Sequence, residues 1–303
     1  MTGSTHRLTK LLREVAQRAQ TRRSRRYQLG GHSLDLPAGH LLDWYRLRHR
    51  RYDEPVADIC AILSQKYGRF EAIDIGANIG ATAALMTRND NVRVLCVEGN
   101  PQYLSLLAGN LARISPTSEI AACYVGATDL EIAGEVKTQA GTAAIEVAAS
   151  PPVNGARIRL RSLATILDEH PGFRSARLVK VDTDGFDAKI VVGSMPTLAV
   201  MRPVLHVEYS PVGEPAIERE YYGMIEKLAE NGYRWFHVFD NFGNHMLRLS
   251  YDERSHLREL SAYAMSCRRD ASPALYYFDI CAVTDDDADV SQALADRYAS
   301  AGV

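Results

Sequence analysis

Residue types that can hold a cofactor and move protons gather at the ends of predicted strands in this chain. An apolar strand runs into Asp74-Ile75-Gly76-Ala77-Asn78-Ile79-Gly80, and the next apolar strand ends on Glu98, about 20 residues after Gly76. Glycines after a strand allow a tight turn and close approach to a ligand. An acid at the end of the following strand is placed to bind a ribose diol. This unit therefore predicts a site for an adenosine-containing cofactor.

The composition of that loop separates two cofactor classes. A dinucleotide site has glycines spaced G-x-G-x-x-G to make room for a pyrophosphate, whereas Asn78 holds the middle position here. Asp74, two residues before Gly76, would repel a diphosphate and would favour a cofactor that carries an amino group and a sulfonium. The loop therefore favours S-adenosylmethionine over NAD. A turn that binds no ligand is the remaining alternative, which the combination of loop, acid and spacing disfavours.

Further acids and a histidine accompany two later apolar strands. Asp182 and Asp184 follow one of them, and His206 and Glu208 share one face of the other, because side chains alternate along a strand. Asp182, His206 and Glu208 are candidate general bases; His206 has the reference pKa nearest to neutral, although a histidine inside an apolar strand is commonly a core residue. Asp182, Asp184 and Glu208 are also hard oxygen ligands that could bind one Mg²⁺.

The alternation of strands and helices predicts an α/β fold with a doubly wound, mostly parallel sheet. In such a sheet, ligands bind outside the carboxyl ends of the strands at the topological switch point, where these polar residues are expected. Strands are expected near residues 71–75, 92–97, 119–126, 178–181, 204–207, 233–239, 246–249 and 276–283, a β-rich insertion over 132–161, and helices over 53–67, 101–114, 163–170, from 186, and over 220–231.

Five segments together resemble the FkbM family of S-adenosylmethionine-dependent methyltransferases: IDIGANIGATA (73–83), VEGNP (97–101), IRLRSLATILDEH (158–170), KVDTDGFDAKIVVGS (180–194) and PVLHVEYS (203–210). The resemblance covers roughly residues 70–210. It implies a Rossmann-like class I methyltransferase fold, and an activity that O-methylates a hydroxyl of a sugar or polyketide. One position departs from the family, which usually has Glu where this chain has Asp184.

The resemblance also implies roles for individual residues. Gly76, Asn78 and Gly80 would surround the methionine and ribose portions of the cofactor, and Asp74 would face its amino group. Glu98 would bind the ribose hydroxyls, Asn100 would lie at the adenine edge, and Asp182 would lie near the methyl-donating sulfur. For Asp182, a strand-end acid that caps the next helix is the structural alternative.

These observations leave several functions open. The leading hypothesis is an O-methyltransferase that acts on a hydroxyl of a sugar, glycan or glycosylated natural product. The alternatives are an RNA or protein methyltransferase, suggested by a basic N-terminal segment, an NAD-linked oxidoreductase, and a non-catalytic scaffold that binds S-adenosylmethionine. The aromatic cluster Tyr233, Trp235, Phe236, Phe239 and Phe242 could stack on a sugar face or belong to the core of the sheet.

Pattern and charge divide the chain into three parts. Residues 1–52 are predicted to be a basic helical N-terminal extension, 53–285 the FkbM-like methyltransferase domain, and 286–303 an acidic C-terminal tail. Within the extension, residues 1–30 are expected to form a basic helix, with a hairpin from Tyr27 to Leu36 as a competing prediction. That basic segment is interpreted as a solvated face, a peripheral contact with anionic lipid, or a homo-oligomer contact. No specific nucleic-acid partner is expected, because few aromatic residues accompany the charges.

The composition of the 303 residues, 46% hydrophobic and 24% charged with a net charge of −2, is typical of a globular protein. No run approaches the roughly 18 apolar residues that cross a bilayer, and the N-terminus lacks the apolar core of a signal peptide. The five cysteines have no C-x-x-C spacing, which disfavours a zinc site and favours a reducing compartment. We therefore expect a cytoplasmic protein, with membrane-peripheral attachment as the alternative.

Overall fold

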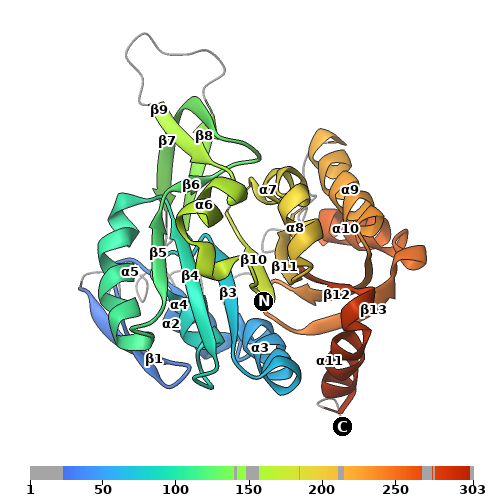
Figure 1. Ribbon diagram of the computed structural model, residues 1–303, viewed down its shortest axis with the longest axis horizontal. Helices are drawn as coiled ribbons and strands as arrows, with labels where there is room; N and C mark the ends of the chain where they lie inside the picture. Colours follow the sequence, from blue (N-terminus) through green and yellow to red (C-terminus); the bar gives the residue numbers. More distant parts are fainter. Residues whose placement is uncertain are drawn as a thin grey trace, which may run out of the picture.

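The computed structural model describes residues 23–139, 142–147, 157–183, 185–210, 215–267, 275 and 277–300. Within them, a central sheet of eight strands forms the middle layer of the molecule (Figure 1). In spatial order its strands are β13 (His245–Ser250), β12 (Tyr233–Asp240), β14 (Phe278–Thr284), β11 (Val204–Tyr209), β10 (Leu178–Val181), β3 (Phe70–Ile75), β4 (Val92–Glu98) and β5 (Glu119–Ala122).

Strands β11, β10, β3, β4 and β5 are parallel, and β14, β12 and β13 continue the sheet in antiparallel pairs. The chain runs outward from β3 through β4 to β5 and then returns to β10, so the topological switch lies between β3 and β10. This arrangement confirms the predicted doubly wound α/β fold. Because β12 runs parallel to β11, its carboxyl end lies at the same edge of the sheet as the amino end of β14.

Helices cover both faces of this sheet, and alternate residues of each buried strand serve the two faces. Ile73 and Ile75 of β3 belong to one apolar core, and Ala72 belongs to the other. The first core includes α6 (Leu163–Glu169), α7 (Asp187–Gly193), α8 (Met195–Met201), α9 (Pro215–Glu230) and α10 (His256–Cys267). The second core includes α3 (Glu54–Tyr67), α4 (Ala81–Met86), α5 (Pro101–Ile114) and α11 (Ala288–Ser300).

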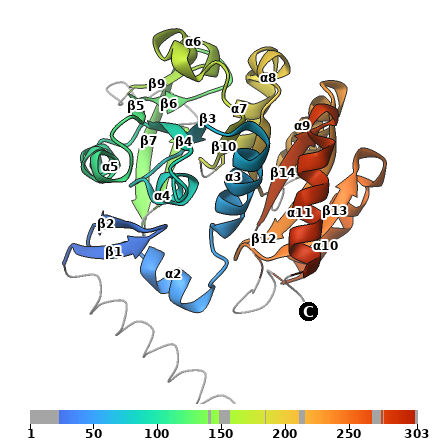
Figure 2. The ribbon, with the colours of Figure 1, turned by 60° about the horizontal axis from the view of Figure 1, so that its bottom comes forward.

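The N-terminal part of the described chain is a hairpin followed by a short helix. Strands β1 (Arg25–Leu29) and β2 (His32–Leu36) pair through Gly30 and Gly31, whose positive φ values of 61° and 89° suit a tight turn. The hairpin therefore exists, and the prediction of a helix continuing to residue 30 is wrong at its end; residues 1–22 lie outside the described chain. Helix α2 (Leu42–Arg48) follows, and a third apolar cluster joins both elements to α4 and α5 (Figure 2).

A smaller sheet extends from one side of the central sheet (Figure 1). It contains, in spatial order, β6 (Tyr124–Val125), β9 (Arg157–Arg161), β7 (Leu130–Gln139) and β8 (Thr142–Val147). This sheet is the β-rich insertion expected over residues 132–161.

The C-terminal segment, expected to be an acidic tail over 286–303, contains helix α11. Helix α11 packs against α3 with Val290 and Leu294 buried, and Lys66 of α3 pairs with Asp287 at 2.8 Å and Asp289 at 2.5 Å. Figure 2 shows the position of α11 at the C-terminal end of the described chain. Acidic residues at the start of α11 therefore have a partner in the folded domain, which the local charge pattern did not reveal. No helix in the described part of the chain is long and apolar enough to span a membrane.

Candidate active site

The loop after β3 lies directly against the end of β10, at the switch point of the sheet. Gly76 has a φ of 83°, and a Cβ atom added there would lie 1.7 Å from the backbone oxygen of Asp182. Asn78 and Gly80 also have positive φ values, 52° and 88°. A left-handed backbone favours Gly and Asn over other residues, so the sequence of this loop follows from its geometry.

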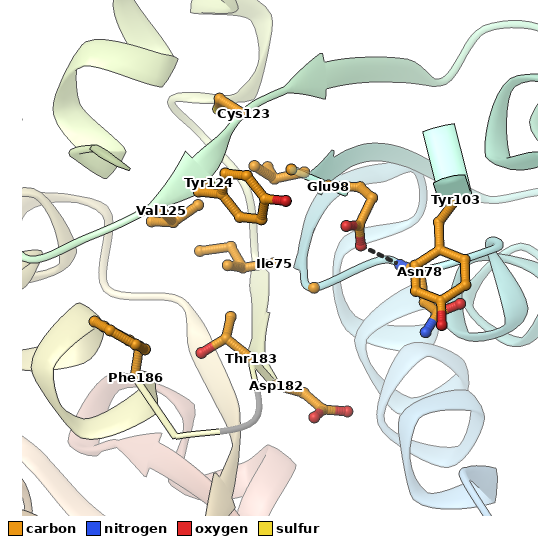
Figure 3. Close-up of a pocket in the computed structure, with 13 residues that line it drawn as sticks. Ile75, Asn78, Glu98, Tyr103, Cys123, Tyr124, Val125, Asp182, Thr183 and Phe186 are labelled. Carbon is orange, nitrogen blue, oxygen red and sulfur yellow. Dashed lines mark hydrogen bonds between the residues drawn. The ribbon is translucent and has the colours of Figure 1, made fainter. Parts of the chain in front are cut away.

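Glu98 connects this loop to the one that follows β4. Its carboxylate accepts a hydrogen bond from the backbone N–H of Asn78 at 2.8 Å (Figure 3) and another from the backbone N–H of Asn100 at 2.7 Å. Burial raises the pKa of Glu98, although these backbone hydrogen bonds act in the opposite direction. Asn100 in turn caps α5 by accepting from the N–H of Gln102 at 3.0 Å. Glu98 therefore holds the shape of two loops in addition to any contact with a ligand.

Gly76, Asn78, Glu98 and Asp182 line a small cavity of about 60 Å³. The sequence did not single out the other residues of its wall, among them Gly99, Tyr103, Cys123, Tyr124, Val125, Thr183 and Phe186 (Figure 3). Gly99 is required at its position, because a Cβ atom there would lie 2.2 Å from the ring of Tyr124. The strand-end rule could have indicated these residues, since most of them follow β4, β5 or β10.

A larger cavity of about 500 Å³ adjoins the small one and shares Gly76, Asn78 and Asp182 with it. Sequence analysis anticipated two more residues of its wall, Glu208 and, within the aromatic cluster, Phe242. The wall residues that it missed come from three places: the segment after β2 (His40, Leu42, Tyr45, Tyr52 and Asp53), the turn after β12 (Asn241), and the position just before β14 (Tyr277). Asn241 and Phe242 follow a predicted strand, but no local signal marks residues 40–53.

The N-terminal segment meets the β12–β13 turn beside this cavity. The rings of His49 and Phe242 stack with centroids 3.7 Å apart, and a Cβ atom on Gly243 would lie 2.0 Å from the backbone oxygen of Arg51. The members of the aromatic cluster predicted around residues 233–242 therefore have two different locations, the cores of the sheet and the cavity wall. Phe236 and Phe239 are buried in the cores, whereas Phe242 lines the cavity.

A buried ion cluster lies beneath the cavity. Lys180 donates to Asp182 at 2.7 Å, and its Nζ lies 3.8 Å from the carboxylate of Asp74, whose other oxygen accepts from Thr82. Asp74 is fully buried and lines neither cavity, while the side chain of Asp182 is 42% exposed. Lys180 was missed by sequence reasoning, although a lysine within the apolar run of β10 is an anomaly that could have identified it.

Asp182 and Glu208 form a carboxyl pair at the ends of neighbouring strands. Burial raises the pKa of Asp182, but the charge and hydrogen bond of Lys180, together with a hydrogen bond to Glu208, outweigh it and the net shift is downward. Asp182 is therefore held ionised. Glu208 also lies opposite Asp279 of β14 in the strand register, which adds another acid at this edge of the sheet.

His206, the other candidate base, lies two residues before Glu208 on the same face of β11, and it lines neither cavity. Burial and the charge of Lys180 lower its pKa to about 3, although Asp182 acts in the opposite direction. It is therefore a neutral core histidine that accepts a proton weakly. Gly80 and Asn100 also line neither cavity. They help to set the conformation of the loops whose other residues line the cavities.

The third residue of the suggested magnesium set, Asp184, lies outside the described residues. Among those that are described, no group of three or more His, Cys, Asp or Glu side chains is arranged to hold a metal ion. Asp182 and Glu208 are close neighbours, so the structure brings together two of the three suggested ligands.

Asp53 is the most unusual acid in the larger cavity. It precedes α3 in a left-handed conformation with φ of 60°, and its side chain does not cap the helix. Burial raises its pKa to about 7; Lys180 and Arg46 lower it, and the charges of Asp182 and Asp74 raise it further.

This pKa gives Asp53→Asn an expected effect on stability. Between about pH 4 and 7 the folded state keeps a proton that the unfolded state has lost, so stability falls as pH rises, by up to about 4 kcal/mol above pH 7. Thermal unfolding should therefore show the variant several degrees more stable than the wild type at pH 8 and close to it at pH 4.5. Asp90→Asn, at an exposed left-handed position with φ of 54°, is the matched control. An equal gain at both pH values would contradict the assignment.

The polar groups of the small cavity discriminate between cofactors. Two carboxylates, Glu98 and Asp182, line it, and its described wall contains no lysine or arginine. Carboxylates accept hydrogen bonds from ribose hydroxyls and attract a positively charged sulfonium, whereas they repel a diphosphate. The residues present therefore fit S-adenosylmethionine and do not fit NAD.

Comparisons with known proteins agree with this geometry. The model of the methyltransferase FkbM domain matches residues 74–235. No curated protein sequence matched the chain.

Among solved structures, the chain is similar to the methyltransferase FkbM from Methylobacillus flagellatus KT, with 14% identity and a TM-score of 0.38 over 71% of this chain; the match spans only 43% of that longer protein. It is also similar to the O-methyltransferase TomG from Streptomyces achromogenes in complex with SAM, with 13% identity, a TM-score of 0.40 and coverage of 76% of this chain and 80% of that one. The family model matches more than half of the chain, including the residues that line the small cavity and part of the wall of the larger one. The chain therefore belongs to the FkbM family and is an S-adenosylmethionine-dependent methyltransferase.

Proposed function

We propose that the protein methylates a hydroxyl group of a sugar, glycan or glycosylated natural product. The observation that carries this proposal is the cavity of about 500 Å³ that shares Asp182 with the small cavity. Its volume suits a sugar-sized ligand. Tyr45, Tyr52, Phe242 and Tyr277 in its wall supply aromatic surface for the apolar side of a sugar, and carboxylates and Asn241 supply hydrogen-bond partners for its hydroxyls.

When bound, S-adenosylmethionine supplies a methyl group on a positively charged sulfur, which keeps the electron pair of the broken bond. The residues of this chain must orient the acceptor oxygen and remove its proton. Asp182 and Glu208 are placed to accept that proton, because they lie side by side at the cavity wall. Lys180 keeps Asp182 ionised and in place through its 2.7 Å hydrogen bond.

The charge of the cavity argues against an RNA acceptor. Asp53, Asp182 and Glu208 line it, against one described lysine, Lys180. A polyanion is bound through clusters of Lys and Arg that neutralise its phosphates, and these carboxylates would repel it. A protein acceptor stays an alternative, and a non-catalytic scaffold would bind the cofactor without turnover.

Transfer of radiolabelled methyl from S-adenosylmethionine to a panel of monosaccharides and oligosaccharides tests the proposal. Label in a base-stable ether on a sugar is the expected result. Reactions with added Mg²⁺ and with EDTA determine whether Asp182 and Glu208 act alone or with a metal ion. Methylation of RNA or protein instead, or cofactor binding without transfer to any acceptor, would overturn the proposal.

Replacement of Glu98 tests the cofactor half of the site. Glu98→Ala should weaken binding of S-adenosylhomocysteine by about tenfold or more, because it removes charge-assisted hydrogen bonds and frees the N–H groups of Asn78 and Asn100. Calorimetric titration measures this change, with NAD as the control ligand. Unchanged affinity would show that Glu98 does not contact the ribose.

A further inference from the structure

The wall of the larger cavity carries more negative than positive charge. Asp53, Asp182 and Glu208 face it, and Lys180 is the one lysine or arginine among its described wall residues. Lys180 is already compensated, because it pairs with Asp182 at 2.7 Å and lies 3.8 Å from the buried Asp74. The charge of Asp53 is therefore left without a counter-ion in the wall.

Asp53 itself has no hydrogen bond or ion pair to its carboxylate among the described residues, although the neighbouring Arg46 and Glu54 pair with each other at 2.5 Å. Its side chain does not cap α3 either. The left-handed backbone at this position suits Asp or Asn, but its carboxylate contributes neither a cap nor a salt bridge. Its place in the cavity wall is consistent with a role in ligand binding.

Apart from Lys180, the charged groups in and beside the cavity wall make it unfavourable to added negative charge. Burial raises the pKa of Asp53, Asp279, Tyr52 and Tyr277, and nearby carboxylates raise each of them further. The groups that face Asp53 are Lys180, Asp182, Arg46 and Asp74. A positive ligand would relieve this repulsion.

Aromatic rings beside these acids complete a surface suited to an organic cation. Tyr45 and Tyr52 stack with centroids 5.3 Å apart and planes 13° from parallel, and both line the cavity together with Phe242 and Tyr277. Aromatic faces attract ammonium groups through cation–π interactions, most strongly in a desolvated site.

We propose that the acceptor is an amino sugar, whose protonated amine is bound by Asp53 and the neighbouring aromatic rings while a hydroxyl on the same molecule faces Asp182 and Glu208. This inference rests on the proposed function and narrows its substrate class. A lysine-containing peptide is the other cation that such a wall could accept. The amino sugar is favoured because the cavity also offers several hydrogen-bond acceptors to hydroxyl groups.

Binding to the complex with S-adenosylhomocysteine tests this proposal without turnover. The probes are glucosamine and 6-amino-6-deoxyglucose, compared with N-acetylglucosamine and glucose. The amines should bind about tenfold or more tightly than their neutral counterparts, because a charge-assisted hydrogen bond is added. Their advantage should shrink as ionic strength rises.

Asp53→Asn should abolish the preference for the amines, whereas the matched control Asp90→Asn should leave it intact. Four results would each overturn the proposal: equal binding of amines and neutral sugars, survival of the preference in Asp53→Asn, absence of binding by every sugar, or tighter binding of a lysine peptide.

The methyl-transfer assay separates this inference from the proposed function. Methylation of neutral sugars without an amine preference would refute only the inference, and an Asp53-dependent preference without methyl transfer to any sugar would refute only the function.

Discussion

Asp182→Asn should lower the rate of methyl transfer by about a hundred- to ten-thousand-fold, the usual contribution of a positioned general base. Asn has nearly the same shape as Asp but cannot accept the proton of the acceptor. The side chain of Asp182 is 42% exposed and turned to both cavities, so the substitution should leave the fold and the cofactor loops in place.

Single-turnover methyl transfer, with calorimetric binding of S-adenosylhomocysteine in parallel, measures this effect. Asp90→Asn provides the same change of charge far from the cavities and should retain full activity. A variant that binds the cofactor product normally and reacts within threefold of the wild type would remove Asp182 from the mechanism. Loss of cofactor binding together with activity would instead indicate a structural role.

Lys180→Met should destabilise the protein by about 3–5 kcal/mol, the usual cost of breaking a buried ion pair. Methionine has a similar length but no charge, so the buried Asp74 and the neighbouring Asp182 would lose their shared cation. The cost arises from the acids left behind rather than from the loss of packing.

Urea unfolding of a double-mutant cycle tests that explanation. Asp74→Asn should itself cost stability in the wild type, yet it should restore part of the stability of Lys180→Met, because a neutral amide needs no counter-ion. Additive effects of the two substitutions would mean that Lys180 and Asp74 do not interact, in conflict with their 3.8 Å separation.

The cofactor half of the site was predictable because its signals are local in sequence. Gly76 and Gly80 report a left-handed backbone, and Glu98 follows at the spacing that a strand–helix–strand unit imposes. Helix α5 begins and ends as predicted, because Asn100 caps it, Pro101 occupies its first position, and its apolar residues repeat at helical spacing.

The acceptor half was not predictable for the opposite reason. Tyr45, Tyr52 and Asp53 reach the cavity only because a hairpin packs on α4 and α5, a contact between distant segments. His206 was misleading, since its type suggests a base while its depth in β11 makes it a weak one. Helices α8 and α11 were missed because tertiary packing, rather than a long apolar period, stabilises them.

The larger cavity has one wall inside the family-matched region and another outside it. Residues 74–235 contribute Gly76, Asn78, Asp182 and Glu208, whereas residues 40–53 and the segment from Asn241 to Tyr277 flank that region on either side. A change of substrate can therefore arise in the flanks without disturbing the loops that bind the cofactor. Chimaeras that exchange both flanks between two members of the family would be the direct way to transplant acceptor specificity, and exchange of one flank alone would leave the cavity with mismatched walls.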